Sequence, residues 1–477
     1  MGTKLRTYVD VMAHHDGVTG SCNLIVVKMP TKETFKIIVD CGLFQGKSES
    51  EGKDNHESNK EFLFNVGELD YVFVTHNHID HIGRLPLLLK KGYKGFIYST
   101  PETKILIPLA LEDSRKVLKE VGKRRNEDTL YSEDDVNVTI ERLKSVDYEN
   151  PIQLNRYIKV TFLKNGHLPG AAIILIQIQY EDEEPINLLF TGDYNNKNSF
   201  FDVPELPVWV KRLPITIVQE STYGNMESSE MIPCFRNNIS KKMSKGGTVI
   251  IPVFSLGRSQ EVLRTLKQMQ DNGELDTNIP IYLDGKLAID YTLIYLEGKL
   301  GIEDIHKDFL PQGLVFVDKG NRCSVIESQE SKIIVTTSGS ASYGPAPFYL
   351  QNYLGDKSAM IHFTGYLFEE SLGRRIKETP DGEFVKVGGM LLKKFAEVES
   401  TAEYSAHAKA DEMIEFLKKF SYLNGVLVNH GEPNTKEIFA KRIAKETNAK
   451  NVGILNREYF FRISPWGIVK SIPTEFM

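Results

Sequence analysis

Short apolar runs separated by polar loops dominate the first two hundred residues of the chain. The runs CNLIVV (22–27), FKIIVD (35–40) and YVFVT (71–75) have the length and β-branched composition of buried strands. Residues 84–92 carry leucines at helical spacing and stop at a glycine, which predicts a helix. Residues 103–143 are also helical in pattern but highly charged, and we interpret them as an insertion outside the core. Further strands are predicted at 157–162, 171–179 and 187–190.

The pattern changes at residue 213, where short apolar strands begin to alternate with helical stretches. This alternation is typical of βαβ units around a parallel sheet. After residue 400 the pattern predicts a helix (410–420), a strand, a second helix (435–447) and a final pair of strands. A chain of 477 residues is too long for one ordinary core. We therefore expect two large domains. The strands of the parallel region are ITIVQ, TVIIPV, IPIYL, GLVFV, KIIVTT and MIHFTG.

Composition and charge narrow the class of protein. The chain is 41% hydrophobic and 26% charged, with a net charge of −6, so any polyanion would be held by a local basic patch or by metal ions. No two of the four cysteines form a CxxC pair, which excludes a zinc ribbon and a dithiol redox motif. The start of the chain has no secretory h-region, and the longest apolar run (171–178) is too short to cross a bilayer. We expect a cytoplasmic protein with no membrane segment.

The segment THNHIDH (75–81) concentrates metal-binding side chains between a predicted strand and a predicted helix. His76 and His78 alternate on an extended segment, so their rings project to one side. Asp80 and His81 follow in a turn. Imidazole and carboxylate are the ligands that zinc prefers, and hydrolytic sites leave a position for water. A single histidine here would most simply be solvated or hydrogen-bonded, but three with an aspartate indicate ligands for two neighbouring ions.

The pattern HxHxDH resembles the signature of the metallo-β-lactamase fold, and its other motifs follow in order. VDCGLFQG carries Asp40 at the end of a strand, where the family has an aspartate that orients ligand histidines. NGHLPGAA carries His167, and LLFTGDYN carries Asp193, at the places of the third and fourth motifs. The resemblance implies a first zinc ion held by His76, His78, His167 and Asp193. It implies a second held by Asp80, His81, Asp193 and His430.

Later motifs resemble the β-CASP nucleases of this superfamily, which include the mRNA 3′-end cleavage endonuclease and its compact prokaryotic homologues. VQESTYGN contains Glu220, EYSAHAKADE contains His407 and VLVNHGEPN contains His430. IPVFSLGRSQE, TTSGSASYGPA and HFTGYLFEESLGRR match three further blocks. The resemblance implies an αββα metallo-β-lactamase sandwich, built from 1–212 and 401–477. A three-layer α/β β-CASP domain (213–400) is inserted, and the active site is expected in the cleft between the two domains.

The implied activity is zinc-dependent hydrolysis of single-stranded RNA by an endonuclease, leaving 5′-phosphate and 3′-hydroxyl ends. Two zinc ions would activate water and offset phosphate charge, while His407, paired with Glu220, would protonate the departing oxygen. Asp40 and Asp80 complete the catalytic set. A histidine at 430 favours RNA over DNA in this family. Small residues before helices provide backbone donors for phosphates, and the candidate substrate contacts are Arg258, Ser338, Arg374 and Arg375, with Tyr343 and Tyr366 as surfaces for base stacking.

Three alternatives stay open. A 5′-to-3′ exoribonuclease of the ribonuclease J type carries an additional C-terminal domain, whereas this chain ends soon after His430. A non-catalytic RNA-processing scaffold would have lost ligands, and here every ligand position is filled. The third alternative is another hydrolase of the fold, which acts on a thioester or a cyclic nucleotide. The inserted domain argues against it, because an insertion of this size suits a long polymer substrate. Two segments, YLDGKLAID and SGSASYGP, depart from the usual β-CASP pattern, which puts substrate contacts in doubt, and a homodimer is left open.

Overall fold

The chain folds into two compact units. The computed structural model describes residues 6–45, 55–230, 233–302, 308–328, 330–365, 367 and 371–476. Unit 1 comprises Met1–Asn198, Asp202–Ser228 and His407–Met477, and unit 2 comprises Ser199–Phe201 and Ser229–Ala406. Among the described residues, no helix is both long and apolar enough to cross a membrane.

Unit 1 contains two large sheets, of which the first has eight strands. Its N-terminal strands pair antiparallel with one another and with the C-terminal hairpin, whereas the strands from β3 to β6 run parallel. The order is β23 (Gly467–Pro473), β22 (Tyr459–Ser464), β1 (Tyr8–Ala13), β2 (Asn23–Lys28), β3 (Thr34–Val39), β4 (Tyr71–Phe73), β5 (Ile97–Ser99) and β6 (Leu143–Ser145).

The second sheet of unit 1 has seven strands and the same mixed character. It is antiparallel from β7 to β10 and parallel from β10 to β21. The order is β21 (Val452–Ile454), β20 (Tyr422–Asn429), β11 (Pro214–Glu220), β10 (Ile186–Phe190), β9 (Ala172–Ile178), β8 (Ile158–Lys164) and β7 (Ile152–Gln153).

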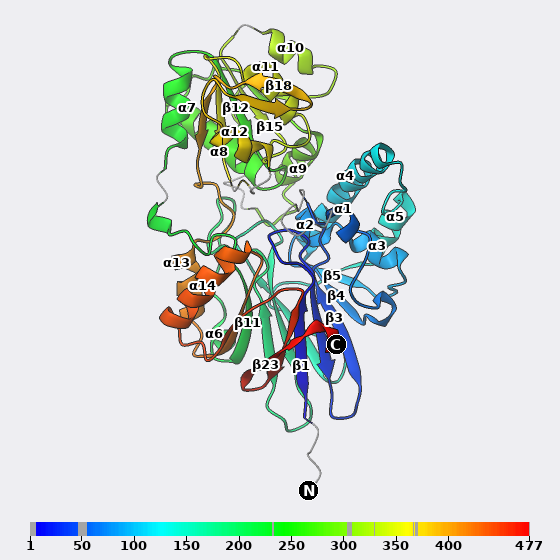
Figure 1. Cartoon of the computed structure of the whole chain (residues 1–477). Coiled ribbons are helices and arrows are strands. Elements are labelled where there is room, and N and C mark those ends of the chain that lie inside the picture. Colours follow the sequence, from blue (N-terminus) through cyan, green and yellow to red (C-terminus); the bar gives the residue numbers. More distant parts are fainter. Residues whose placement is uncertain are drawn as a thin grey trace. The chain divides into compact units, whose positions relative to one another are not determined.

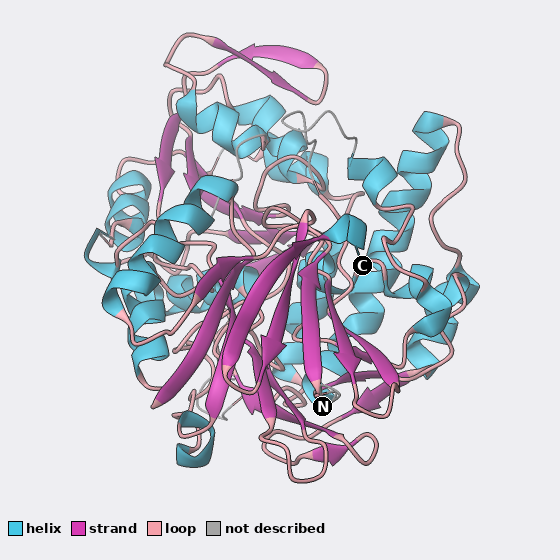
Figure 2. Cartoon of the chain, turned by 60° about the horizontal axis from the view of Figure 1, so that its bottom comes forward, coloured by secondary structure: helices cyan, strands magenta, loops and turns pink. Residues whose placement is uncertain are grey.

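The two sheets pack face to face and are covered by helices on their outer sides. The core between them includes Val11 and Phe73 from the first sheet and Ile174 and Leu188 from the second. Figure 1 shows the helices of this unit on either side of the strands, and Figure 2 shows the strands between them from below. The expected αββα sandwich is confirmed. Its helices are α1 (Asn55–Ser58), α2 (Ile79–Ile82), α3 (Leu85–Lys90), α4 (Pro101–Arg125), α5 (Glu133–Glu141), α6 (Val208–Lys211), α13 (Ala410–Lys418) and α14 (Pro433–Glu446).

The charged segment 103–143 is part of the core of unit 1, so its interpretation as an insertion outside the core was wrong. Leu106, Ile107 and Leu111 of α4 are buried, and the last two pack in a cluster with Val72 of β4. The predicted helical character is confirmed, and the segment forms two helices, α4 and α5. Asn126, in a left-handed conformation, ends α4, and a capping box at Ser132 begins α5.

Strand β11 lies in the second sheet of unit 1, although the change of pattern at residue 213 places it in the expected inserted domain. It pairs parallel with β10 on one side and with β20 on the other. All but the first of its residues are buried. A buried parallel strand has the same apolar composition in either domain, so the composition of ITIVQ does not identify its sheet.

Unit 2 is built on a parallel sheet of six strands whose central members are buried on both faces. Every residue of β12 and β15 is buried, as expected for a sheet covered by helices on both sides. The strand order is β14 (Leu314–Val317), β13 (Ile281–Asp284), β15 (Lys332–Thr336), β12 (Thr248–Pro252), β16 (Met360–Phe363) and β19 (Glu397–Ser400), with a separate hairpin of β17 (Phe384–Val387) and β18 (Met390–Lys393).

The helices of unit 2 alternate with these strands, which gives the βαβ pattern that the sequence predicts. The sheet, its covering helices and the hairpin share an apolar cluster that includes Ile334, Tyr349 and Ile376. The helices are α7 (Phe235–Met243), α8 (Arg258–Asp271), α9 (Lys286–Leu296), α10 (Arg322–Glu327), α11 (Ala346–Tyr353) and α12 (Leu372–Glu378).

Candidate metal centre

Parallel strands of the first sheet bring Asp40 and the THNHIDH segment together. Strand β3 pairs with β4 in a register that places Val39 opposite Phe73, so the chain leaves both strands at the same edge. Asp40 follows β3 in a left-handed conformation (φ 66°). The segment with His76 and His78 follows β4, and Asp80 and His81 lie on the short helix α2 rather than in an open turn.

Parallel strands of the second sheet bring three more candidates to one edge in the same way. Phe190 of β10 pairs with Val218 of β11, and Glu220 of β11 pairs with Asn429 of β20. Asp193 follows β10, Glu220 ends β11, and His430 follows β20 with φ 44°. Carboxyl ends of parallel strands are where such folds place their ligand sites.

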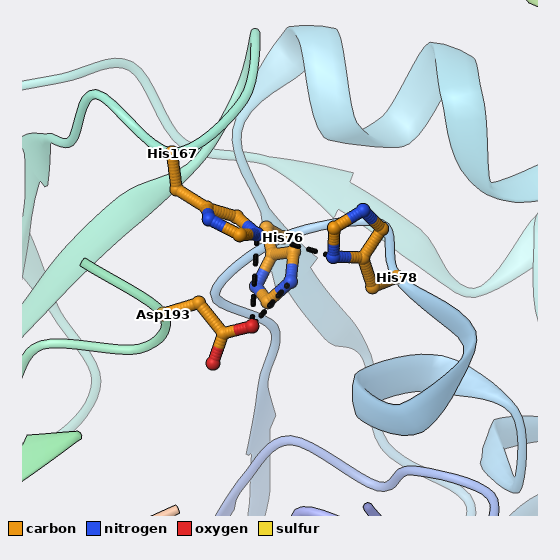
Figure 3. A group of neighbouring side chains, drawn as sticks. All are labelled: His76, His78, His167 and Asp193. Atoms are coloured by element: carbon orange, nitrogen blue, oxygen red, sulfur yellow. Dashed lines mark hydrogen bonds and ion pairs between the residues drawn. The ribbon is translucent and has the colours of Figure 1, made fainter. Parts of the chain in front are cut away.

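His76, His78, His167 and Asp193 form a first cluster, with side chains that point toward one another (Figure 3). His78 Nδ1 lies 3.1 Å from His167 Nε2. Asp193 Oδ2 lies 3.5 Å from His76 Nε2 and 3.6 Å from His167 Nε2. Three separate segments of unit 1, at the ends of β4, β8 and β10, therefore contribute to one group of ligand atoms.

Asp80, His81 and His430 form a second cluster. His81 Nε2 and His430 Nε2 are 3.3 Å apart. Asp80 Oδ2 lies 3.9 Å from the first of these nitrogens and 3.7 Å from the second. The other oxygen of Asp193, Oδ1, lies 3.2 Å from His81 Nε2 and 3.3 Å from His430 Nδ1. Asp193 thus presents one oxygen to each cluster.

The spacing of these atoms fits bound metal ions. Nitrogen and oxygen ligands stand about 2.0–2.1 Å from zinc, so two ligands of a tetrahedral ion are roughly 3.3 Å apart, close to most of the separations in both clusters. His76 Nε2 is also buried without a hydrogen-bond partner. Buried polar atoms normally have partners, and ligation by a cation satisfies such atoms.

Asp40 orients His81 and the start of the histidine segment. His81 Nδ1–H donates to Asp40 Oδ2 over 2.8 Å, which leaves Nε2 facing the second cluster. Asp40 Oδ1 accepts the backbone N–H of Thr75 at 2.8 Å, and Oδ2 accepts its hydroxyl at 2.8 Å. A carboxylate behind a histidine fixes the tautomer that a metal requires. Thr75 was not singled out from the sequence, although it directly precedes His76.

His407 and Glu220 form a hydrogen-bonded pair beside the clusters. His407 Nδ1–H donates to Glu220 Oε1 over 2.8 Å, and His407 Nε2 lies 3.8 Å from Asp193 Oδ2. Glu220 is buried and also accepts the backbone N–H groups of Tyr194 and Thr222. The ring of His407 is therefore oriented by a fixed carboxylate, with its other nitrogen toward the metal ligands.

The electrostatics of the site suit cation binding. Burial lowers the pKa of His78 to about 4 and that of His76 well below its ordinary value, so both rings are neutral. Burial favours a protonated Asp193, but the surrounding histidines outweigh it and hold the pKa of that carboxyl low. Burial would also lower the pKa of His81, yet the Asp193 and Asp40 carboxylates raise it well above its ordinary value, so a bound metal ion would displace a proton from this ring. Neutral imidazoles and ionised carboxylates are the forms that bind metal.

Two further residues at the centre were not found from the sequence. The hydroxyl of Thr222 lies 3.2 Å from His430 Nδ1. The ammonium of Lys409, two residues after His407, lies 3.6 Å from the centre of the Tyr223 ring, whose centroid is 6.2 Å from that of His407. Lysine and threonine are too common near sequence motifs for residue type alone to single them out. A lysine two residues after a motif histidine could nevertheless be looked for in the sequence.

A third group of metal-binding side chains carries an internal cation. His56, Glu57 and Glu127 lie close together at the surface of unit 1. The ammonium of Lys60 is 2.6 Å from Glu57 and 2.7 Å from Glu127, so it already offsets part of the charge of these carboxylates. This group is an ion-pair cluster rather than a further ligand set.

The expected substrate contacts lie in unit 2. Arg258 is buried and donates to the Thr364 carbonyl at 2.6 Å, while the Ser338 hydroxyl lies 3.2 Å from that of Ser340. Arg374 pairs with Glu378 along α12, and Arg375 is exposed on the same helix. Tyr343 is 55% exposed, as a stacking surface requires. Tyr366 lies outside the described residues.

Three family profiles match the sequence in the order of its domains. The Metallo-beta-lactamase superfamily matches residues 17–205, the Beta-Casp domain matches 259–376, and the Zn-dependent metallo-hydrolase RNA specificity domain matches 394–454. The first match contains the THNHIDH segment, and the last contains His407 and His430. The superfamily binds divalent metal ions, which agrees with the two clusters of ligand atoms.

Characterised relatives extend over most of the chain. Ribonuclease TTHA0252 of Thermus thermophilus is 30% identical over 442 residues, which are 90% of this chain and 94% of that protein. Transcription termination factor FttA of Methanosarcina mazei is 30% identical over 448 residues, 89% of this chain and 67% of that one. An RNase J-like protein of Methanocaldococcus jannaschii is 28% identical, covering 89% and 94%. The chain belongs to the β-CASP ribonuclease family of the metallo-β-lactamase superfamily.

Proposed function

We propose that this protein is a zinc-dependent endoribonuclease that hydrolyses phosphodiester bonds of single-stranded RNA, leaving 5′-phosphate and 3′-hydroxyl ends. The observation that carries the proposal is the carboxylate of Asp193, which presents one oxygen to each of two clusters of ligand atoms. A carboxylate shared by two ligand sets is suited to two ions a few ångströms apart, the arrangement of many phosphodiesterases.

The residues that would hold the ions are those of the two clusters. His76, His78, His167 and Asp193 would hold the first, and Asp80, His81, Asp193 and His430 the second. When bound, such ions lower the pKa of water and offset the charge of a phosphate. Asp40 keeps the His81 ring in the tautomer that leaves Nε2 available.

The proton for the departing 3′ oxygen would come from His407. Its Nδ1–H is committed to Glu220, so the nitrogen toward the clusters is Nε2. Burial would lower the pKa of His407, but the Glu220 and Asp193 carboxylates raise it, which keeps a proton available near neutrality. Glu220 is held by two backbone N–H groups, so the pair does not need to reorganise during the reaction.

RNA is the substrate favoured by the relatives and by the C-terminal motif. One relative is named as a ribonuclease, and the profile over 394–454 is described as an RNA specificity domain. Exposed Arg375 and Tyr343 of unit 2 are the candidates for phosphate and base contacts. The second candidate, a 5′-to-3′ exoribonuclease, is favoured by the similarity to an RNase J-like protein over 89% of this chain.

Cleavage of RNA labelled either internally or at its 5′ end tests the proposal. We expect the purified protein to release internal fragments. Cleavage should stop after chelation of the metal ions and recover when zinc is added. Release of 5′ mononucleotides alone would replace the endonuclease with the exonuclease. A protein shown to carry two zinc equivalents that cuts no RNA would refute the nuclease.

Asp80→Ala tests the second metal cluster, because Asp80 belongs only to that cluster. We expect it to abolish cleavage while the protein stays folded. Asp134→Ala, at an exposed carboxylate of α5, is the matched control and should cut at the normal rate. Normal activity of Asp80→Ala would contradict the two-metal assignment.

A further inference from the structure

The side chain of Asn165 joins the two loops that carry His167 and Asp193. Its Nδ2 group donates to the carbonyls of Thr191 at 3.0 Å and Asp193 at 2.6 Å. Its Oδ1 accepts the backbone N–H groups of His167 and Asn195, both at 3.1 Å. Asn165 is 1% exposed, so these bonds are formed away from water.

We propose that Asn165 is a positioning residue for the first metal cluster, fixing the His167 loop against the Asp193 loop so that both ligands reach one ion. The inference rests on the proposed metal binding at this cluster. The hydrogen bonds of Asn165 go to backbone groups and not to the imidazole or carboxylate of the ligands. It acts through their backbones, since one of its bonds reaches the N–H of His167 and another the carbonyl of Asp193.

An asparagine amide suits this position chemically. It has two N–H donors and a carbonyl oxygen that accepts two bonds, and all four are used here. An aspartate keeps the acceptors but places a second oxygen against the carbonyls of Thr191 and Asp193. An alanine leaves two buried N–H groups and two buried carbonyls without these partners.

The two loops approach each other closely at Gly166. The Gly166 N–H donates to the Asn195 carbonyl at 2.9 Å. A Cβ atom on Gly166 would lie 2.7 Å from the carbonyl oxygens of Asn195 and Lys197, so a larger residue would push the loops apart. Asn198 adds one bond from its Nδ2 to the Gly166 carbonyl at 2.9 Å, but this bond reaches neither ligand residue.

The expected consequence is on metal affinity rather than on the fold. His167 Nε2 and Asp193 Oδ2 are 3.6 Å apart, a separation that depends on the register of the two loops. Loss of a partner that orients metal ligands typically weakens binding by about ten- to hundredfold. We expect Asn165→Ala and Asn165→Asp each to weaken one of two zinc equivalents by about that factor.

The experiment measures zinc content by elemental analysis and zinc affinity by competition with a chromophoric chelator, with circular dichroism to report folding. Asn424→Ala is the control, because it removes a buried amide of the same unit that bonds the Pro465 carbonyl and the Lys450 ammonium. Wild type and Asn424→Ala should hold two zinc ions equally tightly, and both Asn165 variants should hold one of them weakly.

Each other outcome separates the inference from the function on which it rests. Wild-type affinity in both folded Asn165 variants would overturn the positioning role, and so would equal weakening in Asn424→Ala. If Asn165→Ala does not fold, the isosteric Asn165→Asp still decides the question. A wild-type protein that binds no zinc would instead refute the proposed function.

Discussion

The Nδ1–H of His407 donates to Oε1 of Glu220 over 2.8 Å, although the two residues are 187 positions apart. Glu220 Oε1 also accepts the Tyr194 N–H at 2.7 Å, and Oε2 accepts the Thr222 N–H at 2.9 Å. Both carboxylate oxygens are therefore engaged, and the imidazole is held in one orientation. A histidine fixed in this way is prepared to transfer a proton from its other nitrogen.

Glu220→Gln tests the pair without a change of size. The amide carries no charge, so it no longer raises the pKa of His407 or holds its tautomer. We expect the rate of RNA cleavage under single-turnover conditions to fall by about 10²–10⁴-fold, with the loss greatest at high pH, where the unpaired histidine is deprotonated.

The control for this variant is Glu415→Gln on α13, an exposed carboxylate that pairs with Lys418. It should cleave RNA at the wild-type rate, and both variants should retain their zinc. Wild-type cleavage by Glu220→Gln at high pH would exclude His407 as the proton donor.

Asp40→Asn tests the residue behind His81. Asparagine tolerates the left-handed conformation at this position, so the backbone should be preserved. Its NH₂ group, however, must face either the Thr75 N–H or the His81 Nδ1–H, both of which are donors. We expect the zinc ion of the second cluster to bind about ten- to hundredfold more weakly, measured by chelator competition. Two tightly bound zinc ions in this variant would contradict the role of Asp40.

Gly42→Ala tests the close packing beneath the metal segment. A Cβ atom at Gly42 would lie 1.5 Å from the carbonyl oxygen of Asp80, and this contact is with backbone that no rotamer change can relieve. We expect the free energy of unfolding to fall by at least about 2 kcal/mol, which is measured as a lower melting temperature. Zinc should be lost as well. Gly17 has open space around its Cβ position, so Gly17→Ala is the control. Equal melting temperatures for the two variants would show that the segment can move.

His362 in unit 2 predicts an acid-sensitive contribution to stability. It is fully buried, packs edge-on against Phe235, and lies within hydrogen-bond distance of Asn238. Burial lowers its pKa to about 4, and the hydrogen bond to the Phe363 carbonyl and the carboxylates of Glu403 and Glu397 only partly oppose this shift. The pKa of a histidine in the unfolded chain is about 6.5. At a pH between about 6.5 and about 4, the unfolded chain therefore binds a proton that the folded unit does not, and the free energy of unfolding decreases as the pH falls.

The lost stability is on the order of 3 kcal/mol at most for this group. Thermal unfolding of the wild type and of His362→Gln, each at about pH 7 and about pH 5, measures this loss of stability, because the variant lacks the titrating group. The variant should be less stable than the wild type at neutral pH, but it should lose less of its free energy of unfolding on acidification. An identical acid dependence in both proteins would assign the effect to other groups.

The sequence was sufficient to identify the candidate ligands because their chemistry is carried by residue type and order. Seven candidates from four motifs lie in two adjacent clusters of ligand atoms. Asn165 was missed for the opposite reason. Three of its four partners are backbone groups of Thr191, Asp193 and Asn195, which lie 26 to 30 positions away. Nothing in the letters NGH distinguishes a buried clamp from a solvated loop residue.

The architecture was predicted better than the position of its charged helices. The βαβ alternation of unit 2 and the helices after residue 400 follow from apolar spacing alone. Helix α4 was misplaced because charges outnumber its apolar residues, although Ile107 and Leu111 face the core. The N-terminal strand β1 also pairs with β22 near the C-terminus, a contact between distant segments that no local pattern reveals.

The pairing of β1 with β22 and of β11 with β20 has a consequence for synthesis on the ribosome. Residues 229–406 of unit 2 are contiguous, and they are complete before His407, β20 or β22 has been made. Strands β1 and β11 must wait for partners more than a domain's length downstream, which makes the folding of unit 1 dependent on distant contacts. The second cluster of candidate ligands needs His430, so it cannot be complete before translation has passed that residue.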